Sequence, residues 1–173
     1  MTMPSLNERP LTAIVVMGVT GSGKTTIGRL LAQELGWRFY DADDFHPPHN
    51  RAKMQSGYAL DDADRASWLE SLHDLLAQSK ARDERVVLAC SALKARYREQ
   101  LGVPDDTSAL IYLTASEALV RERLLQRAGH FMPAALIPSQ FLDLEEPPHA
   151  IRVDASLPPA VVVTQIREAL GLT

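Results

Sequence analysis

The chain has 173 residues, a formal net charge of −4 and a single cysteine. This length is that of one domain, and the absence of a basic run argues against a surface that binds DNA or RNA. One cysteine excludes an internal disulfide, and no apolar run is long enough for a membrane helix. We therefore expect a cytoplasmic protein with one folded domain at residues 11–173, preceded by a disordered lead-in at residues 1–10.

Five short segments have the composition of buried β-strands. They are rich in aliphatic and β-branched residues without strict alternation, which is typical of parallel strands covered on both faces. In chain order they are Ala13–Met17, the weaker Arg38–Tyr40, Val86–Cys90, Ala109–Leu113 and Ile151–Val153.

Segments with helical periodicity separate these strands. Ile27, Leu31 and Leu35 fall on one face of a helix that follows Lys24 and stops at Gly36. Later helices are predicted at residues 64–80, 92–101, 116–127 and 159–170. Strands that alternate with helices along one chain predict a doubly wound α/β fold, a five-stranded parallel sheet with helices on both faces.

A glycine-rich loop follows the first predicted strand. Its spacing, Gly-x4-Gly-Lys-Thr, lets successive backbone N–H groups point at phosphate oxygens in front of a helix N-terminus. Lys24 can reach the β- and γ-phosphates of ATP, and the Thr25 hydroxyl can ligate Mg²⁺. The predicted nucleotide-binding residues of this P-loop are Gly18, Val19, Thr20, Gly21, Ser22, Gly23, Lys24, Thr25 and Thr26.

A GTPase switch is not indicated, because the sequence lacks both an Asn-Lys-x-Asp motif and an Asp-x-x-Gly after the loop. The third strand ends in Cys90-Ser91, where many P-loop proteins have a Walker B aspartate. Another carboxylate must therefore support the metal. Cys90 lies in an apolar run and is interpreted as a buried core residue.

Asp41 and Asp43 follow the second strand, at the edge of the sheet where α/β proteins bind ligands. If the chain is still extended there, the two side chains project to one side and suit one metal and one substrate hydroxyl. The alternative interpretation is a solvated acidic turn that caps a helix.

Together with the P-loop, three segments resemble the gluconate kinases, which are related to shikimate kinase and adenylate kinase. They are residues 41–47 (DADDFHP), 90–94 (CSALK) and 123–131 (RLLQRAGHF). The resemblance extends over about residues 13–170 and implies phosphoryl transfer from ATP to gluconate with Mg²⁺, a mobile lid at residues 124–140 and a possible homodimer. Alternatives are a kinase for another small hydroxylated acid such as shikimate, and an ATP-binding module without turnover.

The resemblance also implies roles for single residues. Lys24, Asp43 and Arg127 would be catalytic, with Asp43 receiving or orienting the substrate hydroxyl, and Arg123 would stack on adenine. Asp41 would hold a magnesium-bound water beside Thr25. The carboxylate of gluconate requires fixed cations, and the candidates for the substrate site are Lys53, Arg65, Lys94, Arg98 and His130.

Overall fold

The computed structural model describes residues 9–127 and 134–172, which contain one five-stranded parallel sheet of order β2-β3-β1-β4-β5. This confirms the predicted α/β fold. The strands are β1 (Ala13–Met17), β2 (Arg38–Asp41), β3 (Val86–Ala89), β4 (Ser108–Thr114) and β5 (Ile151–Asp154). Residues 1–8 of the predicted lead-in and residues 128–133 of the predicted lid lie outside the described ranges.

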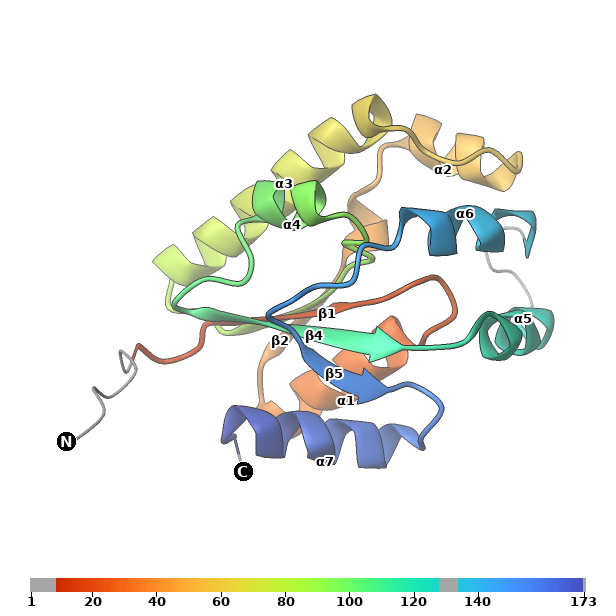
Figure 1. Cartoon of the computed structure of the whole chain (residues 1–173). Coiled ribbons are helices and arrows are strands. Elements are labelled where there is room, and N and C mark those ends of the chain that lie inside the picture. The colour runs from red at the N-terminus through yellow and green to blue at the C-terminus, as the bar shows by residue number, and fades with distance from the viewer. Residues whose placement is uncertain (1–8, 128–133, 173) are drawn as a thin grey trace.

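Helices cover both faces of the sheet (Figure 1). α3 and α4 lie over one face, and α1 and α7 lie over the other. The helices are α1 (Lys24–Leu35), α2 (Pro48–Gln55), α3 (Asp62–Ala81), α4 (Ala95–Leu101), α5 (Glu117–Leu125), α6 (Ile137–Asp143) and α7 (Pro159–Leu170), with 3₁₀ helices at Ala42–Phe45 (η1) and Ala134–Leu136 (η2).

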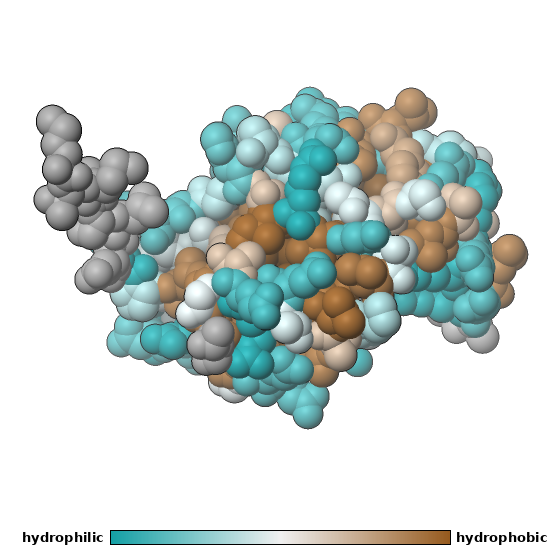
Figure 2. Space-filling model, turned by 60° about the horizontal axis from the view of Figure 1, so that its bottom comes forward, coloured by the Kyte–Doolittle hydropathy of each residue, from teal (hydrophilic) through white to brown (hydrophobic). Residues whose placement is uncertain are grey.

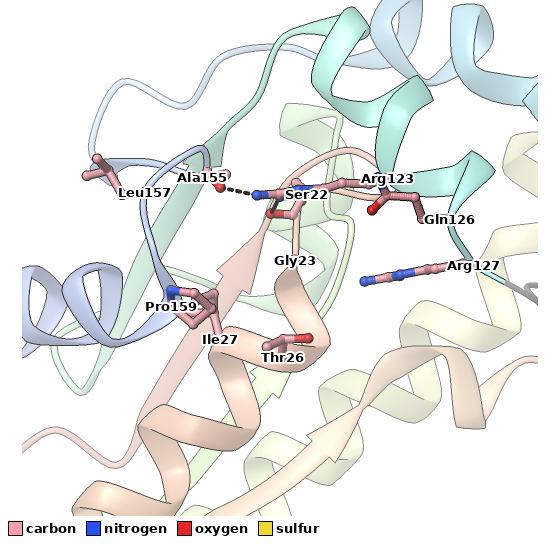
Figure 3. A pocket seen from close by; sticks show the side chains of 10 residues that line it. All are labelled: Ser22, Gly23, Thr26, Ile27, Arg123, Gln126, Arg127, Ala155, Leu157 and Pro159. Carbon is pink, nitrogen blue, oxygen red and sulfur yellow. Dashed lines mark hydrogen bonds between the residues drawn. The ribbon is translucent and has the colours of Figure 1, made fainter.

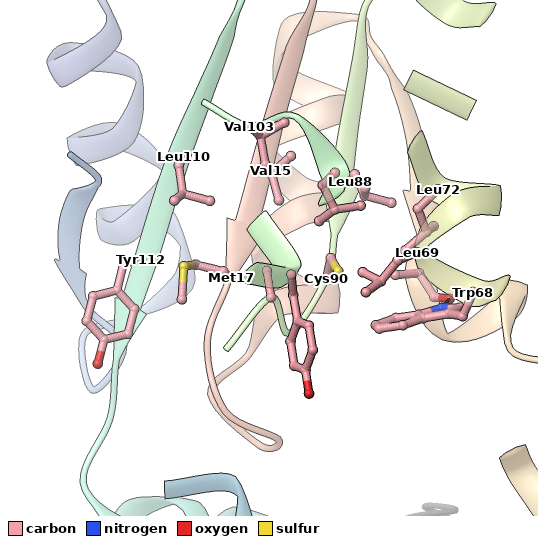
Figure 4. Close-up of a cluster of buried hydrophobic side chains, with 14 residues drawn as sticks. Val15, Met17, Trp68, Leu69, Leu72, Leu88, Cys90, Val103, Leu110 and Tyr112 are labelled. Atoms are coloured by element: carbon pink, nitrogen blue, oxygen red, sulfur yellow. Dashed lines mark hydrogen bonds between the residues drawn. The ribbon is translucent and has the colours of Figure 1, made fainter. Parts of the chain in front are cut away.

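The central strands are apolar on both faces because each face packs against its own helical layer. Along β1, Val15 and Met17 belong to the core under α3 and α4 (Figure 4), whereas Ile14 and Val16 belong to the core over α1 and α7. Successive strand residues point to opposite faces, so a strand buried on both sides reads as one continuous apolar run.

Three helix starts differ from the sequence prediction. α3 begins at Asp62 because Asp61, the residue before the helix, forms a reciprocal capping box with Asp64 in the first turn. α4 begins only at Ala95, since Ala92 has a φ of 44° and cannot continue a right-handed helix. α5 begins after Ser116, whose hydroxyl accepts the N–H of Leu119 as an N-cap.

Two short helices were missed by the sequence prediction. α2 spans eight residues and buries only Asn50 and Met54, so it carries no apolar stripe. α6 spans seven residues, too few for a helical period to stand out. Both lie beside the carboxyl ends of the strands (Figure 1) and contribute residues to the site described below.

The face of the molecule shown in Figure 2 is largely hydrophilic, with apolar side chains visible between polar ones. Within residues 9–127 and 134–172, no helix is both long enough and apolar enough to cross a membrane.

Candidate active site

The P-loop connects β1 to α1 at the carboxyl edge of the sheet. Gly18 and Gly23 have φ values of 155° and 101°, which side-chain-bearing residues rarely adopt. At Gly18 a Cβ would also lie 2.7 Å from the Ser22 hydroxyl oxygen. That buried hydroxyl has no hydrogen-bond partner among the described residues. The loop thus has the glycine conformations and the position in front of the α1 N-terminus that are typical of phosphate-binding loops.

A groove of about 360 Å³ opens beside this loop (Figure 3). Arg123 lines this groove, and its guanidinium donates to the backbone oxygens of Ser22 at 3.0 Å and Ala155 at 2.5 Å. Arg127 extends from the end of α5 into the groove. The lining residues are Ser22, Gly23, Thr26, Ile27, Arg123, Gln126, Arg127, Ala155, Leu157 and Pro159.

The two aspartates lie beside the P-loop lysine and threonine. Thr25 donates its hydroxyl proton to Asp41 Oδ2 at 2.6 Å, and Lys24 Nζ donates to the Val19 carbonyl oxygen at 2.9 Å. The backbone N–H of Asp43 donates to Asp41 Oδ1 at 3.0 Å.

The chain is not extended over both aspartates, so the condition for their side chains to project to one side is not met. Asp41 ends β2 and acts as the N-cap of η1, so the backbone has already turned at Asp43. The turn gives the two carboxylates different surroundings: Asp41 faces Thr25, whereas Asp43 lines a separate cavity with Lys24.

Burial shifts the pKa values of Asp43 and Lys24 toward each other. It raises the pKa of Asp43 to about 6, assisted by repulsion from Asp41 and opposed by Lys24. Burial also lowers the pKa of Lys24, and the negative charge of Asp43 opposes that shift. A carboxylate with a pKa close to neutral is suited to accept a proton at physiological pH.

The second cavity, which we call the acceptor cavity, has a volume of about 40 Å³ and is lined by other P-loop residues than the groove. Its wall holds the cationic side chains of Lys24 and Arg65, the carboxylate of Asp43, whose pKa is raised, and several neutral polar groups. Its lining residues are Thr20, Lys24, Asp43, His46, Met54, Leu60, Arg65, Trp68, Ser91 and Gln140.

Of the predicted substrate-side cations, Arg65 is the one that lines the acceptor cavity. Its guanidinium donates to the Leu60 carbonyl oxygen at 2.7 Å and to the Tyr97 hydroxyl at 2.9 Å. Asp143 of α6 lies 3.7 Å from both Arg65 and Lys94 and connects them. Lys94 is therefore adjacent to the cavity through Asp143 rather than part of its wall.

The other predicted cations are placed differently. Lys53 pairs with Asp64 Oδ2 at 2.6 Å, in the capping box of α3, and does not line the acceptor cavity. Arg98 is buried and donates to the backbone oxygens of Ala92, Leu93 and Glu145. Arg98 does not line the acceptor cavity, and its predicted contact with substrate stays a prediction. His130 lies outside the described residues.

Several wall residues were not predicted as site residues. Gln140 accepts the backbone N–H of Thr20 at 3.0 Å and so connects α6 to the P-loop. His46 stacks on Trp68 with the ring centroids 4.1 Å apart. His46 belongs to the segment 41–47 quoted for the resemblance, but the sequence alone did not distinguish it from a packed loop histidine.

The environment of Cys90 matches the prediction of a core residue. The thiol is buried under α3 and α4, and this burial raises its pKa to about 12. Among the described residues, no group of three or more His, Cys, Asp or Glu side chains is placed to hold a metal ion. Thr25 and Asp41 supply two neighbouring oxygens, the kind of ligand that Mg²⁺ takes alongside nucleotide phosphates.

Comparison with known proteins gives concordant matches. The family model described as shikimate kinase matches residues 20–141. A probable gluconokinase of Mus musculus is 47% identical over 91% of this chain and 96% of the mouse protein. A gluconokinase of Gluconobacter oxydans is 46% identical over 88% of each chain. The crystal structure of a gluconokinase from Sinorhizobium meliloti has a TM-score of 0.83 and 39% identity over 94% of each chain.

Proposed function

The chain belongs to the gluconokinase family, and on this basis we propose that it transfers the terminal phosphoryl group of ATP to a hydroxyl of gluconate, forming 6-phosphogluconate. One observation carries the proposal: Asp43, with its pKa raised to about 6, faces Lys24 in a cavity that adjoins the P-loop. A hydroxyl placed between these residues is next to both a proton acceptor and the phosphate-binding cation.

Each half of the site has a role in this reaction. The groove beside Arg123 holds the nucleotide, and the P-loop N–H groups and Lys24 neutralise the charge that spreads over the transferring phosphoryl group. Asp43 orients the attacking hydroxyl and accepts its proton. Arg127, at the end of α5, adds positive charge when the lid closes over the groove.

The acceptor cavity offers a partner for each part of a hydroxylated acid. Arg65 supplies a fixed cation for the carboxylate, because its remaining contacts hold the guanidinium in place.

Mg²⁺ fits the oxygens of Thr25 and Asp41, and when bound it would neutralise charge on the β- and γ-phosphates.

The test is a coupled assay of ADP release with gluconate, glucose and shikimate as separate acceptors. Glucose lacks the carboxylate that Arg65 is proposed to meet, so kcat/KM for gluconate should be greater by about 10²-fold or more. Equal values for gluconate and glucose would overturn the assignment, and preference for shikimate would reassign the acid. Tight ATP binding without turnover of any acid would identify a non-catalytic ATP-binding module.

A further inference from the structure

His46 is held in one tautomer by two neighbours. Nδ2 of the buried Asn50 lies 2.8 Å from the carbonyl oxygen of Asp64 and 3.3 Å from His46 Nδ1. A carbonyl oxygen can only accept a hydrogen bond, so Asp64 fixes which end of the amide faces it. The second N–H of the same nitrogen then points at Nδ1, which must accept. In the neutral ring the proton therefore lies on Nε2.

Packing fixes the plane of the ring. His46 stacks on Trp68 with an interplanar angle of 13°, and Trp68 is itself anchored by donating Nε1–H to the Ala42 carbonyl oxygen at 2.7 Å. Asn50 is fully buried and His46 is 9% exposed. The orientation of the imidazole is therefore determined by groups that belong to the fold and are present before any ligand binds.

The ring is neutral as well as fixed. Burial, with Arg65 and Arg51 nearby, lowers the pKa of His46 to about 4. A third positive charge beside Lys24 and Arg65 would be unfavourable in this small cavity. A neutral N–H donor avoids that repulsion and still binds an oxygen lone pair.

We infer that His46 is a substrate-binding residue of the acceptor cavity, whose Nε2–H donates a hydrogen bond to a hydroxyl or carboxylate oxygen of the sugar acid. The observations that carry this are the tautomer set by Asn50 and Asp64, the stacking on Trp68 and the place of the ring in the cavity wall. With Nδ1 engaged, Nε2 is the one polar atom of the ring left for a ligand. The inference rests on the proposed function, since it requires a hydroxylated acid in this cavity.

Two substitutions separate the donor from the ring. His46→Phe keeps a flat ring for stacking on Trp68 but removes both nitrogens. His46→Gln places an amide N–H close to the position of Nε2. We expect His46→Phe to raise the KM for gluconate by roughly 10- to 100-fold, the effect of losing one buried hydrogen bond, with the KM for ATP within about 2-fold of the parent. His46→Gln should restore most of the gluconate affinity.

The matched control is His49→Phe, the same replacement at an exposed histidine three residues away. Its KM values should equal those of the parent. A His46→Phe variant that retains the parent KM for gluconate, in a parent enzyme that turns gluconate over, would overturn the inference while leaving the proposed function intact. If the parent turns over only another hydroxylated acid, the proposed function is corrected and the inference about His46 still stands to be tested. The same KM comparison, made with that acid, then decides the role of His46. A parent without turnover of any acid would overturn both.

A second readout is independent of catalysis. In ¹⁵N-labelled full-length protein at neutral pH, the imidazole NMR signals of His46 should report a protonated Nε2 and an unprotonated Nδ1. Asn50→Leu removes the group that selects this tautomer and should produce a mixture of the two forms. A parent spectrum with the proton on Nδ1 would contradict the assignment of Nε2 as the donor.

Discussion

The nucleotide groove and the acceptor cavity share the P-loop but are built from different parts of the chain. The groove has a volume of about 360 Å³, and its fixed points are backbone groups: Arg123 donates to the carbonyl oxygens of Ser22 and Ala155. The acceptor cavity has a volume of about 40 Å³, and its wall carries charged and polar side chains. Recognition in the groove depends on how the loop is folded, whereas recognition in the cavity depends on which side chains line it.

The acceptor cavity is also distinguished by the electrostatics of its side chains. In the acceptor cavity, burial raises the pKa of Asp43 and lowers those of Lys24 and His46. The charged forms of these groups are therefore less stable than in water, and each depends on its neighbours. Single substitutions should consequently have larger effects in the cavity than around the groove, and Lys24, which belongs to the P-loop and lines the acceptor cavity, should be the most sensitive position.

The largest expected effect follows from Lys24→Ala. Removing the cation that meets the transferring phosphate should lower kcat by about 10³-fold or more. Single-turnover and steady-state assays measure this effect, and circular dichroism checks the fold. Arg29→Ala is a suitable control because Arg29 is an exposed cation on the same helix. A folded Lys24→Ala variant with near-native kcat would show that the nucleotide is placed wrongly.

Asp43→Asn should lower kcat by about 10²-fold or more at saturating Mg²⁺ and ATP. The amide keeps the size of the side chain but cannot accept the hydroxyl proton. For the parent, kcat/KM should fall as the pH drops below about 6, where Asp43 becomes protonated. If the pH dependence of kcat/KM is measured for the variant and this fall is absent, the fall is assigned to Asp43.

The same carboxylate should destabilise the fold at neutral pH. Because its pKa is raised from 3.8 to about 6, the folded state binds the proton more tightly than the unfolded state. This contribution therefore reduces stability as the pH rises between these values. Thermal melts should show Asp43→Asn gaining in Tm relative to the parent from about pH 4 to pH 6, and a constant difference across this window would contradict the shifted pKa.

Arg127→Ala should lower kcat by roughly 10- to 100-fold while changing ATP affinity less. This expected decrease in kcat is smaller than that for removing a fully preorganised donor, because Arg127 is exposed at the end of α5. Arg123→Ala should show the reverse pattern, since Arg123 joins the P-loop to the segment after β5. Calorimetric ATP binding and kcat, measured for both variants, test the contrast, and a large loss of ATP affinity with unchanged kcat in Arg127→Ala would break it.

Asp41→Asn should act mainly through the metal. The variant should need more Mg²⁺ for half-maximal rate and should lose less kcat than Asp43→Asn once metal saturates. A Mg²⁺ titration of initial rates at saturating gluconate distinguishes the two. If Asp41→Asn stays inactive at high Mg²⁺ while Asp43→Asn is rescued, their roles must be exchanged.

The smallest effect on the reaction is expected for Arg98→Ala. Its guanidinium donates to three backbone carbonyl oxygens, so the substitution removes three hydrogen bonds, including the bond to the buried Ala92. Unfolding in urea should show a loss of stability of about 1–3 kcal/mol, with the KM for gluconate nearly unchanged in the protein that remains folded. A selective rise in that KM at constant stability would return Arg98 to the substrate site.

Local sequence patterns were sufficient for the elements that hold the nucleotide. The glycine spacing at residues 18–25 and the continuous apolar run of β1 depend on neighbouring residues along the chain. Such patterns predict backbone conformation because φ preferences and strand burial act over a few residues. The five strands were predicted for the same reason, with boundaries that differ from the structure by one residue or less.

The acceptor cavity could be predicted only in part, because its wall comes from segments far apart in the chain. Sequence reasoning grouped Arg65 with Arg98, yet Arg65 lines the cavity and Arg98 is bonded to backbone oxygens, a difference set by the positions of α3 and α4. The turn after Asp41 is capped locally, by the Asp43 N–H on Asp41 Oδ1, and the sequence offered such a capping turn only as the alternative interpretation. Local chain chemistry thus determined the P-loop and the sheet, whereas packing between distant elements decided the burial that sets the pKa of Asp43 and the hydrogen bonds of Asn50 that set the tautomer of His46.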